Sequence, residues 1–324
     1  MINLALMGAG RMGKCHADEL KSIDGAIIAG VFDPDAEAAG KFAETYDVKK
    51  IYASESELFQ DDSIDGVLVC NFSDQHFETL SGLLAAGKKK IFCEKALVRK
   101  LEDGEKLLQL AEKAGATIMV GHHRRYQGGY VELKRMVDAG ELGRIRMAKV
   151  HYCHPGYVRE WGDFFADFDR SGGVILDMMS HLFDQLNWYF GEPVSVSGNS
   201  VMSDRSQPLP MDYVSGTVTY GDNIICGIDG SWQRYGVASD RIEIYGDSAC
   251  AIYNGGDTVD IYRKNEHTER KTGKAKAYNE QMKAFVDMVA NNTPPVNSLY
   301  AGFTSAKLAL TMIDACKQQK TLRF

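Results

Sequence analysis

The chain has 324 residues, which is long enough for two domains that each bury a substantial core. Its hydrophobic content of 44% and charged content of 25% are ordinary for a soluble globular protein. The net charge of -7 at pH 7 comes without a basic stripe, so we expect no nucleic-acid partner.

The cysteines and the apolar runs bear on where the protein works. Seven cysteines are scattered without any C-x-x-C spacing, which predicts free thiols in a reducing compartment. No apolar run reaches about 18 residues, the length that spans a bilayer, and no basic segment precedes an apolar one at the N-terminus. We therefore predict a cytoplasmic protein with neither a membrane span nor a secretion signal.

Strand-like and helix-like stretches alternate from the N-terminus to about residue 121. Strands are expected at 2–7, 26–32, 64–70, 90–93 and 116–120, and helices at 11–23, 35–45, 75–86 and 101–114. This alternation predicts a doubly wound α/β domain over residues 1–121, in which helices cover both faces of a parallel sheet. Ligands bind such a sheet at the carboxyl ends of its strands.

The first expected strand runs into a loop with the glycine spacing of dinucleotide-binding sites. Gly8 would supply a sharp turn, Gly10 would let the backbone approach a pyrophosphate, and Gly13 would let the helix pack on the strand. Arg11 and Met12 stand at the start of that helix, whose N–H groups would face the phosphates. The alternative is a glycine-rich turn without a ligand.

Asp33 ends the second expected strand, about 20 residues beyond the glycine loop, where a carboxylate binds the adenosine ribose hydroxyls. A carboxylate repels a 2′-phosphate, and Pro34 and Asp35 follow it without any Arg or Lys. The sequence therefore predicts NAD as the cofactor, with NADP less favoured. The alternative role of Asp33 is to cap the helix that starts near Asp35.

Polar residues also end the later strands, at Ser73 and at Glu94 with Lys95. These positions join the glycine loop as predicted cofactor-binding residues, because all of them lie at strand carboxyl ends. The Lys95 ammonium could stabilise the alkoxide that develops as hydride leaves a substrate hydroxyl, or relay its proton. The alternative is a surface lysine that follows a strand.

After Gly121 the pattern changes. Helices are expected near 127–139 and 175–190, a strand at 145–154, β-rich sequence from 194 to about 262, and closing helices at 278–291 and 299–318. This is typical of an α+β domain with a largely antiparallel sheet, which we assign to residues 122–324.

Three polar residues recur at helical spacing in the second domain. Asp177, His181 and Asp184 stand at i, i+4 and i+7, so the spacing predicts one shared helix face. A histidine has an ordinary pKa near neutrality, and a neighbouring carboxylate would make it a better base. The paired glycines at 172 and 173 would let backbone lie close to a ligand. The alternative is a histidine satisfied within the core.

These motifs resemble those of the Gfo/Idh/MocA family, that of glucose–fructose oxidoreductase and inositol dehydrogenase. The resemblance runs nearly end to end and covers the glycine loop with His16, then Glu94-Lys95, 124–126, 140–143, 172–184, and the closing helices around 278–285 and 301–306. The segment 124–130 and the pair Asp177-Met178 look closest to the inositol dehydrogenase branch.

The resemblance implies a Rossmann domain and an α+β domain whose open sheet forms a homodimer or homotetramer interface. It also implies oxidation or reduction of a ring carbon in a polyol or sugar. By position, Lys95, Asp177 and His181 look like the family's catalytic trio: His181 takes the hydroxyl proton, Lys95 polarises the reacting oxygen and Asp177 orients the substrate. Ser73 and His76 match the loop beside the cofactor, although His76 could instead be a helix cap or a core contact.

The chain departs from the family pattern in two places. Ala96 replaces the proline that usually follows the catalytic lysine, often through a cis bond. A cis bond before alanine costs about 2.5–4 kcal/mol, so we expect a trans bond here. The loop 71–73 reads Asn-Phe-Ser where the family often has Thr-Pro, which would alter the contacts with the cofactor.

Four further residues could line a polyol pocket, because hydroxyl-rich ligands favour hydrogen-bond donors beside an aromatic face. They are Arg124, Tyr126, His154 and Trp161. The histidine pairs at 122–123 and 151–154 lack accompanying Cys or carboxylate spacing, so we predict no metal. Two rival functions stay open: a glycoside hydrolase that oxidises the sugar transiently with NAD, and a non-catalytic cofactor sensor, which Ala96 favours.

Overall fold

The computed structural model describes residues 1–154, 164–165, 167–201, 213–232, 238–273 and 276–324. These residues form two compact units. The first unit comprises Met1–His123 with Lys276–Phe303, and the second comprises Arg124–Ala275 with Thr304–Phe324. Within the described ranges, every helix is too short or too polar to cross a membrane.

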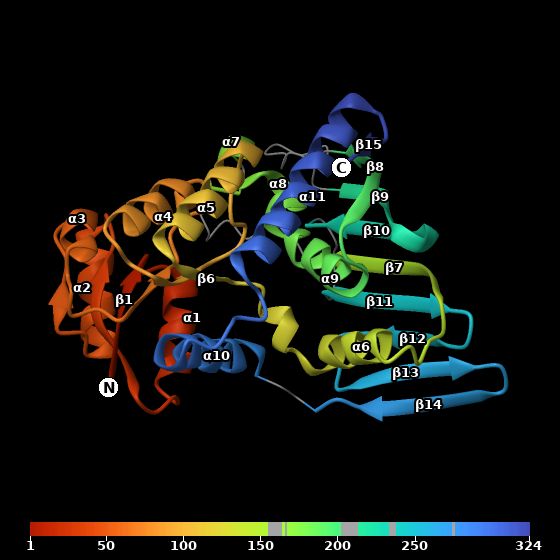
Figure 1. Cartoon of the computed structure of the whole chain (residues 1–324), viewed down its shortest axis with the longest axis horizontal. Helices are drawn as coiled ribbons and strands as arrows, with labels where there is room; N and C mark the ends of the chain where they lie inside the picture. Colours follow the sequence, from red (N-terminus) through yellow and green to blue (C-terminus); the bar gives the residue numbers. More distant parts are fainter. Residues whose placement is uncertain (155–163, 166, 202–212, 233–237, 274–275) are drawn as a thin grey trace. The chain divides into compact units, whose positions relative to one another are not determined.

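The first unit (Figure 1) is built on a six-stranded parallel sheet, in which hydrogen-bonded neighbours give the order β3-β2-β1-β4-β5-β6. Its strands are β1 (Ile2–Met7), β2 (Ala26–Phe32), β3 (Lys50–Ile51), β4 (Gly66–Val69), β5 (Lys90–Cys93) and β6 (Thr117–Val120). The order reverses between β1 and β4, which is the switch point where doubly wound sheets bind ligands. The predicted parallel sheet is confirmed.

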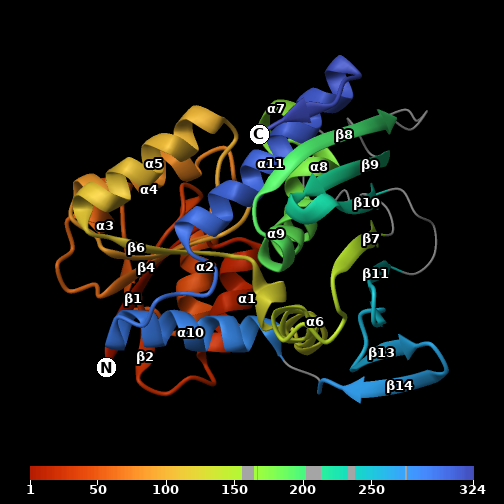
Figure 2. The same ribbon diagram turned by 45° about the vertical axis from the view of Figure 1, so that its right-hand side comes forward.

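Helices cover both faces of this sheet. They are α1 (Arg11–Leu20), α2 (Ala36–Tyr46), α3 (Glu55–Phe59), α4 (His76–Ala85), α5 (Leu101–Ala114) and α10 (Ala277–Asn291). Figure 2 shows α4 with α5 on one side and α1 with α10 on the other, and both pairs are in contact. The sequence prediction contained neither β3 nor α3, because elements this short have no readable period.

Helix α10 also packs on β1 and β5, and its Phe285 is fully buried. A Cβ atom at Gly66 of β4 would lie 3.0 Å from Val289 of this helix, so helix and sheet are in close contact. This packing explains why residues 276–303 count with the first unit. The sequence expectation placed all of 122–324 in the second domain, because chain order alone does not show which sheet a late helix covers.

The second unit contains a nine-stranded sheet with the order β14-β13-β12-β11-β7-β10-β9-β8-β15. Its strands are β7 (Ile145–Cys153), β8 (Pro193–Val201), β9 (Tyr213–Tyr220), β10 (Ile224–Ser231), β11 (Ser239–Gly246), β12 (Cys250–Tyr253), β13 (Thr258–Arg263), β14 (Glu266–Lys271) and β15 (Leu322–Arg323). Strands β7 and β10 pair in parallel, and the other neighbours pair antiparallel. The predicted, largely antiparallel sheet is confirmed.

One face of this sheet carries the core of the second unit. The helices are α6 (Gly128–Asp138), α7 (Phe168–Ser171), α8 (Gly173–Asp177), α9 (Ser180–Phe190) and α11 (Leu299–Gln318), which begins in the first unit, with 3₁₀ turns η1 (His123–Tyr126) and η3 (Gly221–Asn223). Helix α6 packs on β12 and β13, and α8 packs on β9 and β10. Ala148, Cys226 and Ile244 point to this face and are fully buried.

The helix expected near 175–190 is interrupted after Asp177. The carbonyl of Val174 accepts hydrogen bonds from the N–H groups of both Met178 (3.1 Å) and Met179 (2.9 Å). One extra residue therefore enters the helical repeat, as in a π-bulge. As a result α8 ends before this turn and α9 begins after it.

The interruption changes the predicted pattern of polar residues. Asp177 ends α8, whereas His181 and Asp184 lie in α9, so the expectation of one continuous helix over these residues is wrong. The cause lies in tertiary packing. Met179 is fully buried against β10, where a Cβ atom at Gly230 would lie 2.5 Å from its sulfur.

Glycines in α6 and α2 provide a test of how tightly α6 packs on β12. A Cβ atom at Gly129 of α6 would overlap the ring of Tyr253, so Gly129→Ala should lower the free energy of unfolding by about 1–3 kcal/mol. Gly40 in α2 faces open space, so Gly40→Ala should raise it by about 0.5–1 kcal/mol. Urea unfolding of both variants measures the difference, and equal effects would contradict the packing of α6 on β12.

Candidate active site

The loop after β1 contains the three glycines of the predicted nucleotide site. Gly8 has a φ of +100°, and a Cβ atom there would lie 2.6 Å from the backbone carbonyl carbon of Cys70. A Cβ atom at Gly13 would overlap the carbonyl oxygen of Gly8, so the start of α1 packs on the end of β1. Among described residues, no atom lies within 4 Å of a Cβ atom placed on Gly10. This open backbone fits the approach of a pyrophosphate.

The N-terminus of α1 follows directly from this loop. Gly10 is its N-cap, no side chain in the described part of the chain caps it, and its first turn has no acidic residue. An uncapped N-terminus and the helix dipole both favour an anion. The backbone at Arg11, Met12 and Gly13 therefore fits phosphate groups, and these residues stay predicted cofactor ligands.

Asp33 is tied to the glycine loop by its carboxylate. One oxygen accepts a hydrogen bond from the N–H of Ala9 (2.7 Å), and the other accepts one from the N–H of Asp35 (2.9 Å). The alternative role as a helix cap is wrong, because Asp35 itself caps α2 by accepting from the N–H groups of Glu37 and Ala38. The position of Asp33 beside the glycine loop fits the ribose hydroxyls of NAD.

The loop between β4 and α4 contains the predicted residues Ser73 and His76. Ser73 is half-buried. His76 is fully buried, with Nδ1 at 2.9 Å from the carbonyl oxygen of Ala96 and Nε2 at 3.2 Å from that of Asn71. Burial lowers the pKa of His76 and outweighs these two carbonyls, which raise it. Its ring is thus engaged with backbone, and a direct role in cofactor binding stays a prediction.

Glu94 and Lys95 follow β5. The Glu94 side chain is buried, with Oε1 at 2.6 Å from Nε2 of His16, and its Oε2 accepts a hydrogen bond from the N–H of Lys95 at 3.1 Å. Burial raises the pKa of Glu94, but the hydrogen bond and charge of His16, together with the charge of Lys95, outweigh it and lower that pKa. Lys95 is half-buried.

The peptide bond between Lys95 and Ala96 is cis. The expectation of a trans bond, which rested on the cost of a cis bond before a residue other than proline, is wrong. Ala96 is buried and its carbonyl oxygen accepts a hydrogen bond from His76, so tertiary contacts determine the backbone here. The preference of a single peptide bond for the trans form does not take such tertiary contacts into account.

The two other predicted catalytic residues lie in the second unit. Asp177 is half-buried at the end of α8, and His181 is buried in the first turn of α9. Lys95 belongs to the first unit. The assignment of Lys95, Asp177 and His181 to one catalytic trio therefore stays a prediction.

Arg124, a predicted substrate-binding residue, is held within the second unit. Its guanidinium forms a salt bridge with Asp240 (2.7 Å) and donates to the hydroxyl of Tyr130 (2.8 Å). It also lies 4.0 Å from the ring centre of Tyr152, which adds a cation–π contact. These contacts show that Arg124 has a structural role, and substrate binding by it stays a prediction.

Arg125 and Asp184 form a pair that the sequence did not reveal. Both guanidinium contacts to the carboxylate measure 2.8 Å, and both side chains are buried. The two residues are 59 positions apart in the chain, so no spacing pattern links them. Asp184 therefore serves this ion pair, whereas the sequence pattern had placed it beside His181.

The remaining predicted pocket residues differ in their surroundings. Tyr126 is half-buried, and burial raises the pKa of its phenol. His154 is exposed, with its ring 5.4 Å from that of Tyr152. Trp161 lies outside the described residues. Their roles in substrate binding stay predictions.

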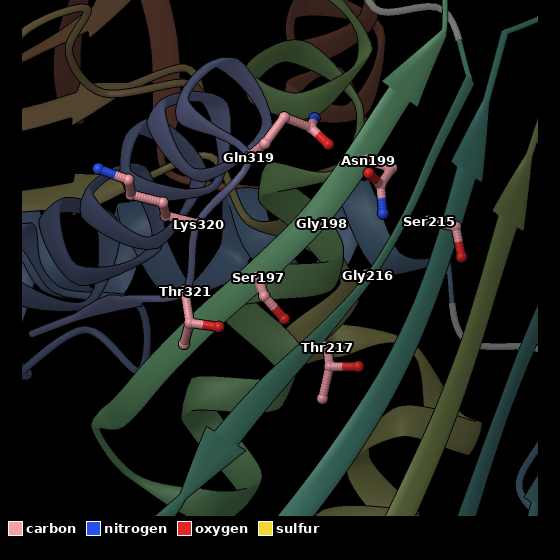
Figure 3. A pocket seen from close by; sticks show the side chains of 9 residues that line it. All are labelled: Ser197, Gly198, Asn199, Ser215, Gly216, Thr217, Gln319, Lys320 and Thr321. Carbon is pink, nitrogen blue, oxygen red and sulfur yellow. The ribbon is translucent and has the colours of Figure 1, made fainter.

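A cavity of about 400 Å³ lies elsewhere in the second unit, where β8 and β9 meet the turn before β15 (Figure 3). Ser197, Asn199 and Thr217 line it together with Lys320, and none of its lining residues is a predicted site residue. On the β13–β14 hairpin, ligand atoms of Asp260, His267 and Glu269 lie within 4.8 Å of one another. That group is largely exposed and includes none of the histidines weighed from the sequence, so the absence of a metal stays a prediction.

Two family models match this chain. Residues 2–122 match one described as the oxidoreductase family, NAD-binding Rossmann fold, and residues 130–252 match one described as the GFO/IDH/MocA C-terminal domain. The first match covers the parallel sheet of the first unit, and the second covers much of the second unit.

Two curated proteins and one solved structure are similar over nearly their whole length. A myo-inositol 2-dehydrogenase of Thermotoga maritima is 27% identical, with 98% of this chain and 96% of that protein covered. An inositol 2-dehydrogenase of Rhizobium meliloti is 26% identical, with 99% and 98% covered. An oxidoreductase of Agrobacterium radiobacter, solved with NAD⁺, L-tartaric acid and magnesium, has a TM-score of 0.91 at 16% identity, with 99% and 98% covered. At that identity, the structural similarity shows the fold.

The tethered carboxylate gives a test of cofactor choice. Asp33→Ser removes the charged partner of the ribose hydroxyls and the repulsion of a 2′-phosphate, so the ratio of the NADPH and NADH dissociation constants should shift toward NADPH by about 10–100-fold. Fluorescence titration of the bound reduced cofactor measures both constants. The matched control is Asp35→Ser, because serine also caps helices and should leave the ratio unchanged. Equal shifts in the two variants would contradict the role of Asp33.

Proposed function

Because the chain belongs to the GFO/IDH/MocA family of oxidoreductases, we propose that it oxidises a secondary hydroxyl on the ring of a cyclic polyol or sugar, with NAD as cofactor. The observation that carries this substrate class is the similarity to inositol 2-dehydrogenases over nearly the whole chain. The glycine loop and the tethered Asp33 support NAD as the cofactor. An inositol is therefore the first substrate to test.

The proposed chemistry assigns one role to each of three side chains. Lys95 donates a hydrogen bond to the reacting oxygen and stabilises the negative charge that develops on it. His181 accepts the hydroxyl proton, a task suited to an imidazole near neutral pH. Asp177 binds a neighbouring hydroxyl and orients the ring. Bound NAD supplies the acceptor for the hydride.

Residues 1–121 are proposed as the NAD-binding domain and residues 122–324 as the substrate-binding and oligomerisation domain. All seven cysteines are free thiols, which supports a reducing compartment such as the cytoplasm. Arg124, Tyr126, His154 and Trp161 remain the candidates for the polyol pocket. Ser73, His76 and Glu94 remain candidate cofactor-binding residues.

The sheet face opposite the buried core supports self-association into a dimer or tetramer. Strand register places Ile225, Met147, Tyr245 and Tyr262 in one row across that face. Ile225 is 51% exposed and Tyr262 is 42% exposed. Contiguous apolar side chains on a surface typically mark an interaction site.

Removal of two catalytic side chains tests the assigned roles. Lys95→Met and His181→Ala should each lower kcat by about 100-fold or more, because each removes transition-state stabilisation or proton transfer. NADH formation with a panel of inositols and aldoses measures kcat, and binding of NADH should change little in His181→Ala. Lys100→Met, at an exposed lysine nearby in the chain, is the control.

Other outcomes of the same panel would select a different function. Release of free sugar without net NADH would indicate a glycoside hydrolase that uses NAD transiently. Binding of NADH with no turnover across the panel would indicate a cofactor sensor. Wild-type kcat in Lys95→Met would contradict the role of the lysine within an active dehydrogenase.

One substitution tests the proposed interface. Ile225→Lys places a charge in the exposed row and should dissociate the oligomer, because burying an unpaired ammonium is costly. Ile51→Lys, at a residue of the first unit that is 48% exposed, should leave the assembly intact. Light scattering coupled to size-exclusion chromatography measures the mass. A wild-type chain that runs as a monomer would contradict the interface.

A further inference from the structure

Two buried histidines contact the short segment that carries Lys95, one on each side of it. His16 comes from α1 and contacts Glu94, and His76 comes from the first turn of α4 and contacts Ala96. Both rings are 0% exposed. Two helices far apart in sequence are thereby attached to three consecutive residues after β5.

The contact before the lysine is a charge-assisted hydrogen bond. Nε2 of His16 lies 2.6 Å from Oε1 of Glu94, at the short end of the range for such pairs. The second oxygen of Glu94 accepts a hydrogen bond from the backbone N–H of Lys95 itself. Phe92 packs edge-on against the His16 ring, with 4.9 Å between ring centres, and limits its rotation. The carboxylate thus links α1 to the Lys95 backbone.

The contact after the lysine uses a backbone carbonyl. Nδ1 of His76 lies 2.9 Å from the oxygen of Ala96, and Nε2 lies 3.2 Å from that of Asn71. Both partners are carbonyl acceptors, so a hydrogen bond forms only where the ring nitrogen carries a proton. A neutral ring carries one N–H, and the shorter distance favours donation to Ala96. His76 therefore holds the residue directly after Lys95.

We propose that His16 and His76 are positioning residues, which hold the backbone on both sides of Lys95 and so set where its ammonium group lies. A lysine side chain is a flexible four-carbon stem, so its reach is defined only if its backbone is fixed. A misplacement of about 1 Å can cost about 100-fold in rate. The inference rests on the proposed catalytic role of Lys95, and neither histidine needs to touch the substrate.

The two contacts use different ring nitrogens, which allows a crossed test. The amide nitrogen of asparagine is as many bonds from Cα as Nδ1 of histidine, and that of glutamine is as many bonds away as Nε2. His76→Asn therefore keeps the donor to Ala96, and His76→Gln loses it. At the other position His16→Gln keeps the donor to Glu94, and His16→Asn loses it. Asparagine is thus the substitution that keeps the contact at position 76, whereas glutamine is the one that keeps it at position 16.

The main measurement is the acylation rate of Lys95 by acetic anhydride as a function of pH, relative to the exposed Lys41 in the same molecule, by peptide mass spectrometry. The rate reports how accessible and reactive the amino group is, and it needs no substrate. We expect His76→Asn and His16→Gln to stay near the wild-type rate, and His76→Gln and His16→Asn to differ from it about tenfold. In turnover assays, kcat should follow the same order, while KM for NAD changes less in the His16 variants.

Three outcomes would overturn the proposal. They are equal effects of asparagine and glutamine at both positions, the reverse order, and no change in any variant. Phe42→Leu, which alters a fully buried residue of the first unit away from this segment, controls for loss of stability. If the two variants at one histidine do not fold, the two variants at the other histidine decide the result. Absence of turnover in the wild type would refute the proposed function, whereas the acylation data would still decide the positioning role.

Discussion

The contact on which the first unit depends is the approach of Gly8 to the backbone of Cys70. No Cβ atom fits at Gly8, so the ends of β1 and β4 lie closer there than any side chain would allow. This is the point where the strand order reverses, and the loops after the two strands diverge to opposite sides. The open backbone at Gly10, the uncapped start of α1 and the Asp33 carboxylate all adjoin that junction.

In both units, buried charged side chains are paired with other polar groups. A buried charge without a partner is costly, so each such group constrains its neighbour. In the first unit, Glu94 is held by His16 and by the backbone N–H of Lys95. In the second unit, the pair of Arg125 and Asp184 connects η1 to α9. Removing one partner of such a buried pair typically costs about 3–5 kcal/mol.

Several predictions from sequence were right because they depended on local patterns. The alternation of elements and the glycine turn after β1 depend on neighbours along the chain. The parallel sheet and the antiparallel sheet were confirmed for the same reason. The predictions that failed depended on contacts between distant segments. The bond before Ala96 is cis beside the His76 ring, and the helix at Met179 is interrupted where it packs on Gly230.

The sequence alone determined the alternation of strands and helices in the first unit, its NAD-binding Rossmann fold and the family. Each of these is recorded in residue types at short, regular spacing, which sterics and periodicity translate directly into local structure. The tertiary structure alone decided that α10 belongs with the first sheet, that Asp184 pairs with Arg125, and that two histidines flank Lys95. These facts depend on which surfaces meet when the chain folds, and spacing along the chain does not encode that.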